Sequence, residues 1–442
     1  MEYKKHEQDA EGVTTICLDR LTGKEVKIRS KYLIGADGGN SLVTENENLP
    51  IEGKMGVGGS MNILFRADLS KYVAHRPSVL YWVMQPGADV GGIGMGLVRM
   101  IRPWNEWLIV WGYDVTQPAP NVDEAMATEV ARQLVGDPKL EIELLSANTW
   151  TVNNAYATKM SKGRVFIMGD AAHRHPPSNG LGSNTSIQDA FNLCWKLAIV
   201  LKNQAGSALL ETYDTERAPI AKQVVTRANQ SISEFGPIFE ALGMTGGTDY
   251  ELIKSNMDAR CGTDAQAEVQ RDALNKAIAF KRYEFDAHGI EMNQRYSSSA
   301  IVRDGQIEPS FEKDAVLHYQ PTTWPGARLP HAWVFDASGR KHSTLDLAGG
   351  GTFSLFTGLG GEPWATAAKE LSNEFGIIIN VHVIGPRQEY VDHTGSWALA
   401  REVTDSGCIL TRPDQHVCWR SKTIADKPKD EIKRVLNQIL AK

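Results

Sequence analysis

Cysteine is scarce in this sequence, which has five cysteines among 442 residues, all far apart and none in a CxxC pair. An odd number of dispersed cysteines is poor material for a disulfide framework or a zinc site, so we expect a reducing compartment and no metal. Long hydrophobic runs are also lacking, because no apolar segment approaches the ~18 residues of a membrane span. The first residues contain no hydrophobic core of a signal peptide. The sequence therefore predicts a cytoplasmic protein without a membrane partner.

The sequence also lacks clusters of basic or of acidic residues. The 47 basic and 53 acidic side chains give a net charge of −6 that is spread along the chain. Nucleic acids and anionic lipids are bound by clustered basic side chains, so we expect neither as a partner. The composition is that of an ordinary globular protein, with 42% hydrophobic residues. A chain of this length suits two or three domains.

The N-terminal part predicts a short buried strand that ends in a glycine-rich turn. Residues 13–18 and 25–28 alternate like the strands of a hairpin, and they lead into an apolar strand at residues 31–34. The turn that follows is Gly35-Ala-Asp-Gly-Gly39. Glycines at the end of a buried strand allow close approach of the backbone to a ligand.

A second group of strands is predicted at residues 79–84, 91–98 and 107–111, separated by glycine and proline turns. Side chains alternate between the two faces of a strand. One face is therefore expected to be large and aromatic, with Trp107, Ile109, Trp111 and Tyr113.

Two helices are predicted at residues 122–137 and 183–203. The second has apolar residues at the i, i+3, i+4, i+7 spacing of a buried stripe. The stripe consists of Ile187, Ala190, Phe191, Cys194, Leu197, Ala198 and Leu201, widened by Leu193 and Trp195. We expect this helix to be central in the fold.

The C-terminal part has its own pattern. Helical character continues over residues 209–288, and polar, proline-containing sequence at 304–325 predicts a linker. From about residue 326 the predicted order is strand, strand, helix, strand, hairpin, helix, which is thioredoxin-like. Thr357-Gly-Leu-Gly-Gly361 stands where a redox CxxC pair would be. A structural or dimer-packing role is therefore expected.

The stretch after residue 168 combines an acid, two prolines and glycines at the start of a helix: GDAAHRHPPSNGLGSNTS, residues 169–186. Asp170 ends a predicted strand, where a carboxylate can accept hydrogen bonds from ribose hydroxyls. Gly180 and Gly182 let a ligand approach, and Ser183, Asn184 and Thr185 are candidate helix caps. The positive end of the helix would stabilise negative charge on a ligand, such as the edge of a reduced flavin. A plain strand-to-helix turn is the alternative.

These residues carry a family resemblance. Gly35 to Ser41 resembles the second, and Gly163 to Asp170 the third, flavin motif of the single-component FAD-dependent aromatic hydroxylases. The continuation to Ala198, the segment Leu210 to Pro219 and the thioredoxin-like tail resemble the phenol hydroxylase branch. Its chlorophenol hydroxylases are the nearest likeness, through residues 70–86 and 104–112.

The resemblance implies an α/β (α+β mixed) fold. Its parts are a partial doubly wound FAD-binding domain (1–50 and 150–225), an antiparallel substrate-binding sheet (51–149), a helical region and linker (226–325) and a thioredoxin-like domain without CxxC (326–442). It implies that NADPH reduces FAD, that oxygen is activated as a flavin hydroperoxide, and that a phenol, chlorinated or not, is hydroxylated at the ortho carbon. A homodimer is the implied assembly.

The resemblance also implies roles for single residues. Asp37 and Gly38 would lie near the pyrophosphate, and Gly169 and Asp170 near the ribitol or ribose hydroxyls. The flavin ring would lie beside Pro177, Gly180, Leu181, Gly182, Ser183 and Asn184. Trp82, Trp107 and Trp111 are candidates for the phenol pocket, although packing in a sheet core is the commoner role for each.

His173, Arg174 and His175 have less defined expectations. Two histidines without a third ligand are weak as a metal site, so we expect them to be hydrogen-bonded turn residues. Arg174 could pair with a phosphate or with Asp37, or lie on the surface. The arginine usual after the serine of the second motif is absent after Ser41.

The chain also has no GxGxxG, the phosphate cradle with which this family opens. We expect the first βαβ unit to be missing, so that the strands ending at Ile34 and Met168 lack a central neighbour and expose apolar edges. The family's phenol-activating carboxylate lies in that unit, so no catalytic residue is assigned. Such a fragment or shortened paralogue is expected to bind FAD poorly and to aggregate. A non-catalytic binding or oligomerisation module is the alternative to an enzyme.

Overall fold

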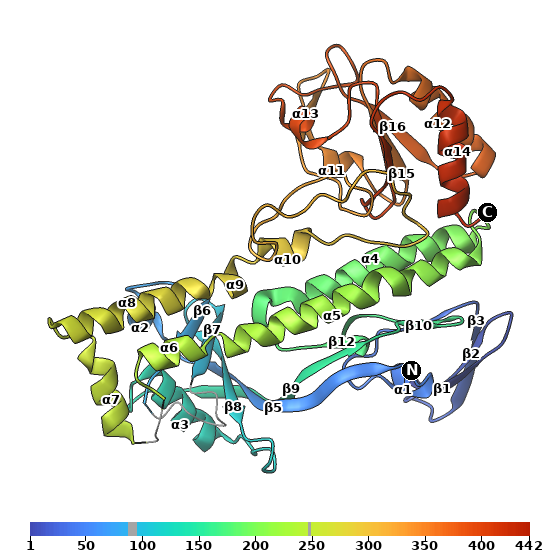
Figure 1. Ribbon diagram of the computed structural model, residues 1–442. Coiled ribbons are helices and arrows are strands. Elements are labelled where there is room, and N and C mark those ends of the chain that lie inside the picture. Colours follow the sequence, from blue (N-terminus) through green and yellow to red (C-terminus); the bar gives the residue numbers. More distant parts are fainter. Residues whose placement is uncertain (87–94, 246–248) are drawn as a thin grey trace.

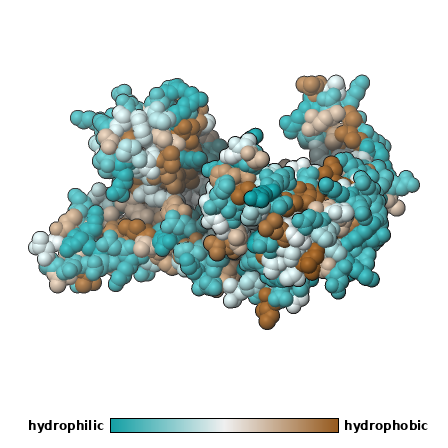
Figure 2. All heavy atoms as spheres, turned by 90° about the horizontal axis from the view of Figure 1, so that it is seen from above, coloured by the Kyte–Doolittle hydropathy of each residue, from teal (hydrophilic) through white to brown (hydrophobic). Residues whose placement is uncertain are grey.

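The computed structural model describes residues 1–86, 95–245 and 249–442. Two long helices, α4 (Leu181–Leu201) and α5 (Glu211–Ser233), cross the middle of the molecule (Figure 1). The C-terminal unit lies on one side of this pair, and the N-terminal strands and the large sheet lie on the other. The fold is mixed α/β, as the sequence predicts. Seen from above, the surface is largely hydrophilic with hydrophobic residues in separate patches (Figure 2).

The N-terminal residues form a three-stranded antiparallel sheet of β1 (Glu2–Gln8), β2 (Val13–Leu18) and β3 (Glu25–Ser30). The predicted hairpin is therefore confirmed. Strand β1 was not predicted, because EYKKHEQ is nearly all polar and shows no apolar alternation.

The two motif strands are direct neighbours. Strand β4 (Leu33–Gly35) pairs in parallel with β11 (Val165–Ile167), and β10 (Ser161–Lys162) pairs with the far side of β11. The neighbour that the sequence predicts to be missing does not belong between β4 and β11, since the backbone N–H of Met168 donates to the Gly35 carbonyl at 3.0 Å. In the part of the chain that the structure describes, the other edge of β4 has no partner strand. Ile34 on this strand is 39% exposed.

The largest sheet has the order β12-β9-β5-β8-β7-β6. Its strands are β5 (Ile51–Arg66), β6 (Leu80–Val83), β7 (Gly96–Arg102), β8 (Glu106–Tyr113), β9 (Glu143–Ala157) and β12 (His173–Arg174). Two predicted strands are confirmed as β6 and β8, whereas the strand expected at 91–98 begins at Gly96, and residues 91–94 lie outside the described residues. The long β5 and β9 were missed, because glycines interrupt β5 and asparagines interrupt β9.

Helix α3 (Glu124–Val135) covers one face of this sheet. Asp123 caps its first turn, and Gly136 ends it in the left-handed conformation at φ 76°. Its buried Ala127, Ala131 and Leu134 belong to the same hydrophobic cluster as Trp107 and Trp111. The aromatic face predicted from the sequence is therefore the core side of the sheet.

The orientation of α4 differs from the prediction. Ile187, Phe191 and Leu201 of the expected buried stripe are 66%, 46% and 43% exposed. Leu193 and Trp195 are buried, and with them the polar Thr185, Asp189, Asn192 and Lys196. Asp189, Asn192 and Lys196 are buried because each finds a charged or hydrogen-bonding partner inside the protein, and the apolar spacing of the sequence does not reveal such partners.

The remaining helices are short and connect these units. They are α1 (Leu42–Asn46), α2 (Ser70–Val73), α6 (Gly236–Ala241), α7 (Tyr250–Ala259), α8 (Ala265–Phe280), α9 (Arg282–Phe285) and α10 (His288–Met292). Residues 304–325 contain no helix or strand, in agreement with the predicted linker, yet Thr323 and Trp324 within them are buried. None of the helices in the described ranges is long and apolar enough to span a bilayer.

The C-terminal unit has a four-stranded sheet of order β16-β15-β18-β19. Its strands are β15 (Phe353–Thr357), β16 (Ile379–Val383), β18 (Cys408–Thr411) and β19 (Val417–Ser421), with helices α12 (Glu362–Phe375) and α14 (Pro428–Ile439). Strands β13 (Trp333–Asp336), β14 (Lys341–Ser343) and β17 (Tyr390–Val391) form a smaller sheet, and α11 (Thr344–Leu347) and α13 (Ser396–Ala400) complete the unit. The predicted order of elements is present, and the thioredoxin-like interpretation stays a prediction.

Candidate functional site

The two glycine-rich turns predicted from the sequence meet at one edge of the parallel strand pair. Ligands of parallel α/β sheets bind beyond the carboxyl ends of the strands. Here β4 runs into Gly35 and Gly38, and β11 runs into Gly169. Gly169 has φ +60°, and a Cβ placed on it would lie 3.0 Å from Ser186 Oγ on α4. Only glycine fits this position without strain, which keeps the turn close to the start of α4.

Asp37, in the first turn, is used inside the protein. Its carboxylate accepts hydrogen bonds from Ser41 Oγ at 2.6 Å and from the backbone N–H of Val43 at 3.2 Å. Ser41 in turn caps α1 by accepting from the N–H of Thr44 at 3.0 Å. Asp37 therefore shapes the turn, and the open space beside Gly38 is where a ligand can approach, because no other atom lies within 4 Å of a Cβ placed there.

Asp170, in the second turn, is exposed, and its carboxylate has no hydrogen-bond partner among the described residues. Arg174 lies behind it and donates from Nε to the Asp170 carbonyl at 2.9 Å and from Nη2 to the Ala171 carbonyl at 3.2 Å. Burial lowers the pKa of Arg174, and the nearby charges of Asp170 and Asp37 oppose that shift. Arg174 thus braces the second motif turn and leaves the Asp170 carboxylate free for a ligand.

The start of α4 is uncapped. The 3-10 turn Ser178–Gly180 precedes it, Gly180 is its N-cap residue at φ 63°, and within the described residues no side chain accepts a hydrogen bond from the first turn. The expected caps do not act as caps, since α4 begins at Leu181, and Asn184 Nδ2 donates to the Gly180 carbonyl at 2.8 Å. The first N–H groups, from Leu181 to Ser183, are orphan donors at the positive end of a 21-residue helix. This end can bind an anionic ligand edge.

The two histidines are hydrogen-bonded turn residues, as expected. His173 is fully buried, and its Nε2 donates to Asp189 Oδ2 at 2.8 Å. His175 donates from Nδ1 to the Pro176 carbonyl at 2.7 Å, and its ring lies 3.6 Å from a Cβ placed on Gly182. Burial lowers the pKa of His175, which keeps this ring neutral beside the helix start. Pro177 follows as the residue that enters the 3-10 turn.

Sequence reasoning missed Asp189. This buried side chain accepts from the backbone N–H of Gly169 at 3.1 Å and from Arg217 Nε at 2.7 Å, besides the bond from His173. Burial opposes its ionisation, but Arg217 and His173 outweigh burial and lower its pKa. The signal available in the sequence was an aspartate inside an apolar helical stretch, which requires a partner when it is buried.

The three candidate tryptophans lie in two places. Trp107 and Trp111 are 0% and 1% exposed in the core between the sheet and α3, so their position fits the core-packing alternative. Trp82 points to the other face and packs against Phe235 with the rings tilted and their centroids 4.7 Å apart.

That other face is only half-buried. It carries Leu64, Leu108 and Val110, together with a polar pair in which Trp150 Nε1 donates to Asn62 Oδ1 at 3.1 Å. An apolar surface with a few polar groups has the character of a small-molecule binding wall.

Comparison with known proteins gives two family matches. A family model described as an FAD binding domain matches residues 1–228, and one described as the C-terminal part of aromatic-ring hydroxylases matches residues 322–442.

Two curated relatives match over almost the whole chain. The 2,4-dichlorophenol 6-monooxygenase of Cupriavidus pinatubonensis (strain JMP 134 / LMG 1197) is 52% identical over 443 residues, covering 100% of this chain and 74% of the relative. The phenol 2-monooxygenase of Pseudomonas sp. (strain EST1001) is 48% identical, covering 99% of this chain and 70% of the relative.

Solved structures agree in fold. The flavin-dependent monooxygenase PieE, in complex with FAD and substrate, superposes with a TM-score of 0.91 at 40% identity, over 100% of this chain and 75% of that chain. Aklavinone-11 hydroxylase with FAD and aklavinone gives a TM-score of 0.77 at 26% identity, over 100% of this chain and 73% of that chain.

Proposed function

The chain belongs to the FAD-dependent aromatic-ring hydroxylases, flavoprotein monooxygenases whose members include phenol and chlorophenol hydroxylases, and from this premise we propose its reaction. We propose that it uses NADPH and molecular oxygen to hydroxylate a phenol at the carbon ortho to its hydroxyl group. Bound FAD supplies the redox chemistry, because it accepts the hydride and activates oxygen. Phenol and 2,4-dichlorophenol are the first substrates to test.

The observation that carries the proposal is the pairing of a free acid with an uncapped helix. The Asp170 carboxylate is exposed and unbonded, and the first N–H groups of α4 have no side-chain cap. A carboxylate suits ribose or ribitol hydroxyls, and a helix N-terminus suits a pyrimidine edge that becomes negative on reduction. The residues present therefore fit FAD.

We assign the other cofactor contacts to the neighbouring turns. Gly38 gives the backbone room for the pyrophosphate, and Gly169 directs Asp170 toward the adjoining hydroxyls. Pro177 and Gly180 to Asn184 line the flavin ring, where neutral His175 adds no charge next to the helix start. Asp37 acts indirectly, through its bonds to Ser41 and Val43.

We place the phenol against the half-buried face of the large sheet. Leu64, Leu108 and Val110 provide apolar contact there, and Trp82 borders this surface from β6. Trp107 and Trp111 support the sheet from its core side. No general base for the phenol hydroxyl is assigned.

A non-catalytic binding module, the alternative left open by the sequence, is not favoured. Such a module has no need for an unbonded acid and an uncapped helix end at the same edge of a sheet. We further propose a homodimer, which sedimentation equilibrium of the purified chain tests directly.

The function is tested by following the oxygen atom. The purified chain is first titrated with FAD by flavin fluorescence, and NADPH and NADH oxidation are then compared with and without phenol or 2,4-dichlorophenol. Under ¹⁸O₂, the proposal expects phenol-stimulated NADPH oxidation and a catechol that contains one ¹⁸O atom. FAD binding without any hydroxylated product from either phenol would contradict it, because the site would then serve another reaction.

A further inference from the structure

Asp189 joins the turn after β11 to the interior of the protein. It is 1% exposed and accepts three hydrogen bonds from three segments: Gly169 N–H, His173 Nε2 and Arg217 Nε. The bond to Gly169 lies one residue before Asp170, the free acid of the cofactor site. Because Gly169 holds a left-handed φ of +60°, this bond fixes the direction in which the turn leaves the strand.

Arg217 continues the connection away from the site. Its guanidinium is fully buried on α5 and donates from Nη1 to the hydroxyl of Tyr296 at 3.0 Å and to Gln294 Oε1 at 3.3 Å. It also donates from Nη2 to the Thr185 carbonyl of α4 at 3.3 Å. Arg217 is thus held at both ends, by Asp189 and by Tyr296.

Tyr296 connects Arg217 to the C-terminal unit. Its ring stacks on His416, with centroids 4.2 Å apart, and its backbone N–H donates to the Gly326 carbonyl at 2.9 Å. A cavity of about 200 Å³, lined among others by Gln188, Asn192 and Tyr296, borders the same residues. The tyrosine hydroxyl therefore links the C-terminal hairpin to Arg217.

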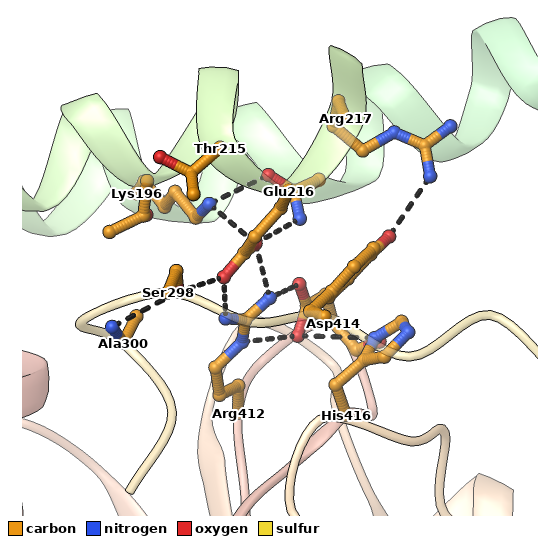
Figure 3. A network of polar contacts seen from close by, with 12 residues as sticks. Lys196, Thr215, Glu216, Arg217, Ser298, Ala300, Arg412, Asp414 and His416 are labelled. Carbon is orange, nitrogen blue, oxygen red and sulfur yellow. Dashed lines mark hydrogen bonds and ion pairs between the residues drawn. The ribbon is translucent and has the colours of Figure 1, made fainter. Parts of the chain in front are cut away.

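A second set of buried charges fixes the hairpin against the helices (Figure 3). Arg412 donates to both oxygens of Glu216, from Nη1 at 2.5 Å and from Nη2 at 3.0 Å, and it also pairs with Asp414 at 2.6 Å. Lys196 of α4 completes the cluster with a bond to Glu216 at 2.8 Å. Buried charges that are fully paired tolerate little displacement, so the hairpin and the helices hold one relative position.

We propose that Asp189 and Arg217 are positioning residues that hold the turn Gly169–Ala171 in its ligand-binding shape, and that Tyr296 makes their alignment depend on the C-terminal hairpin. The proposal rests on the proposed function in one respect, that this turn binds FAD. A chain of contacts runs from the C-terminal hairpin through Tyr296, Arg217 and Asp189 to the turn. Weakening the contacts at the hairpin should therefore increase the mobility of the turn.

The test removes one hydroxyl far from the turn. Tyr296→Phe keeps the ring stacked on His416 and deletes only the hydroxyl group that accepts a hydrogen bond from Arg217 Nη1. The matched control is Tyr72→Phe, which deletes a hydroxyl bonded to Asp137 in the large-sheet region. Amide hydrogen exchange is measured on the FAD-free chain for peptides covering residues 165–175 and, as an internal reference, α3.

The expected result for Tyr296→Phe is faster exchange in residues 165–175 with unchanged exchange in α3, and an FAD dissociation constant raised about 3- to 30-fold. The absorption spectrum of the bound flavin should also shift. Tyr72→Phe should leave exchange in residues 165–175, the FAD dissociation constant and the flavin spectrum unchanged. Unaltered exchange, flavin affinity and flavin spectrum in folded Tyr296→Phe protein would overturn the proposal.

A milder variant covers the case in which Tyr296→Phe does not fold. Gln294→Ala removes the weaker 3.3 Å contact to Arg217 and should produce the same changes in smaller measure. The exchange measurement does not involve a phenol, NADPH or oxygen. A chain that binds FAD but hydroxylates no phenol would therefore contradict the proposed function and leave this inference testable.

Discussion

At the scale of single residues, the two acids of the motif turns have different tasks. Asp37 is bonded within its own turn, whereas Asp170 is free. The sequence predicts that both are near the cofactor, because each follows a short buried strand and glycine. It does not predict which carboxylate is already used, since that depends on whether Ser41 turns its hydroxyl inward to cap α1.

Replacing Asp170 tests the free acid. We expect Asp170→Asn to weaken FAD binding roughly tenfold or more, because a hydrogen bond to a charged group contributes about 1.5 kcal/mol or more. Thermal stability of the FAD-free chain should stay the same. Fluorescence titration measures the affinity, with exposed Asp258→Asn as the control. Equal affinities for the two variants would show that Asp170 does not touch the cofactor.

Replacing Asp37 should instead lower the stability of the FAD-free chain. Asp37→Ala removes the acceptor of Ser41 Oγ and the Val43 N–H, so we expect a loss of about 1 kcal/mol in the free energy of unfolding, the usual cost of a lost helix-start interaction. Urea unfolding of the FAD-free chain measures it. If stability is unchanged and only FAD affinity falls, Asp37 binds the cofactor directly.

At the scale of elements, strongly apolar strands and the longer helices could be predicted from the sequence. Which face of α4 is buried could not be predicted. The apolar spacing that begins at Ile187 is regular, yet this face is exposed and the face with Asp189, Asn192 and Lys196 is buried. Partners such as Arg217 come from distant parts of the chain, and no local pattern contains them. Strands β5 and β9 were missed for a related reason, because pairing along a partner strand stabilises residues that have little strand preference alone.

Unfolding experiments on two variants can show which face of α4 is buried. Phe191→Glu, at a position 46% exposed, should change the free energy of unfolding by less than about 0.5 kcal/mol. Leu193→Ala, at a fully buried position, should cost about 2 to 5 kcal/mol. The two residues are neighbours on one helix, so helix propensity cannot explain such a difference. Comparable losses in both variants would mean that the face of Phe191 is covered.

At the scale of the whole molecule, ionic contacts hold the C-terminal unit to the central helices. Burial alone would raise the pKa of Glu216, but Arg412 and Lys196 hold it well below its usual value of 4.5. Asp414, whose pKa burial would also raise, is held well below its usual value by Arg412. Carboxylates with lowered pKa values stabilise the folded state above their ordinary pKa, and this stabilisation is lost as the pH falls through the folded values.

Acid should therefore weaken the molecule at this contact. We expect Arg412→Met to cost about 3 to 5 kcal/mol at pH 7, because it leaves buried carboxylates without their cation. The cost should shrink below about pH 4.5, where the same carboxylates can be protonated. Urea unfolding at several pH values measures both. Arg66→Met, which breaks an exposed pair with Glu143, should cost less than about 1 kcal/mol at any pH.

A cost for Arg412→Met that is the same at pH 4 and pH 7 would show that lost packing, and not charge, explains it. Separate family models match residues 1–228 and 322–442, and the predicted domain boundaries stay a prediction. Sequence reasoning could not foresee the ionic contact between these two parts of the chain. Its bonded partners Glu216 and Arg412 are 196 positions apart in the chain.

The long strands β5 and β9 have a mechanical consequence. They pair from Ile51 opposite Ala157 to Arg66 opposite Glu143, so one ribbon begins beside the two glycine-rich turns and extends through the large sheet. Two regions of the protein that are joined by a continuous pair of strands cannot separate from one another by rotating about a hinge. Their relative movement must be a bend of the ribbon itself, and the register is broken between Lys54 and Gly58, where Gly56 has φ +64°. At this short interruption, where a glycine has a left-handed conformation, we expect the sheet to bend without separating its two longest strands.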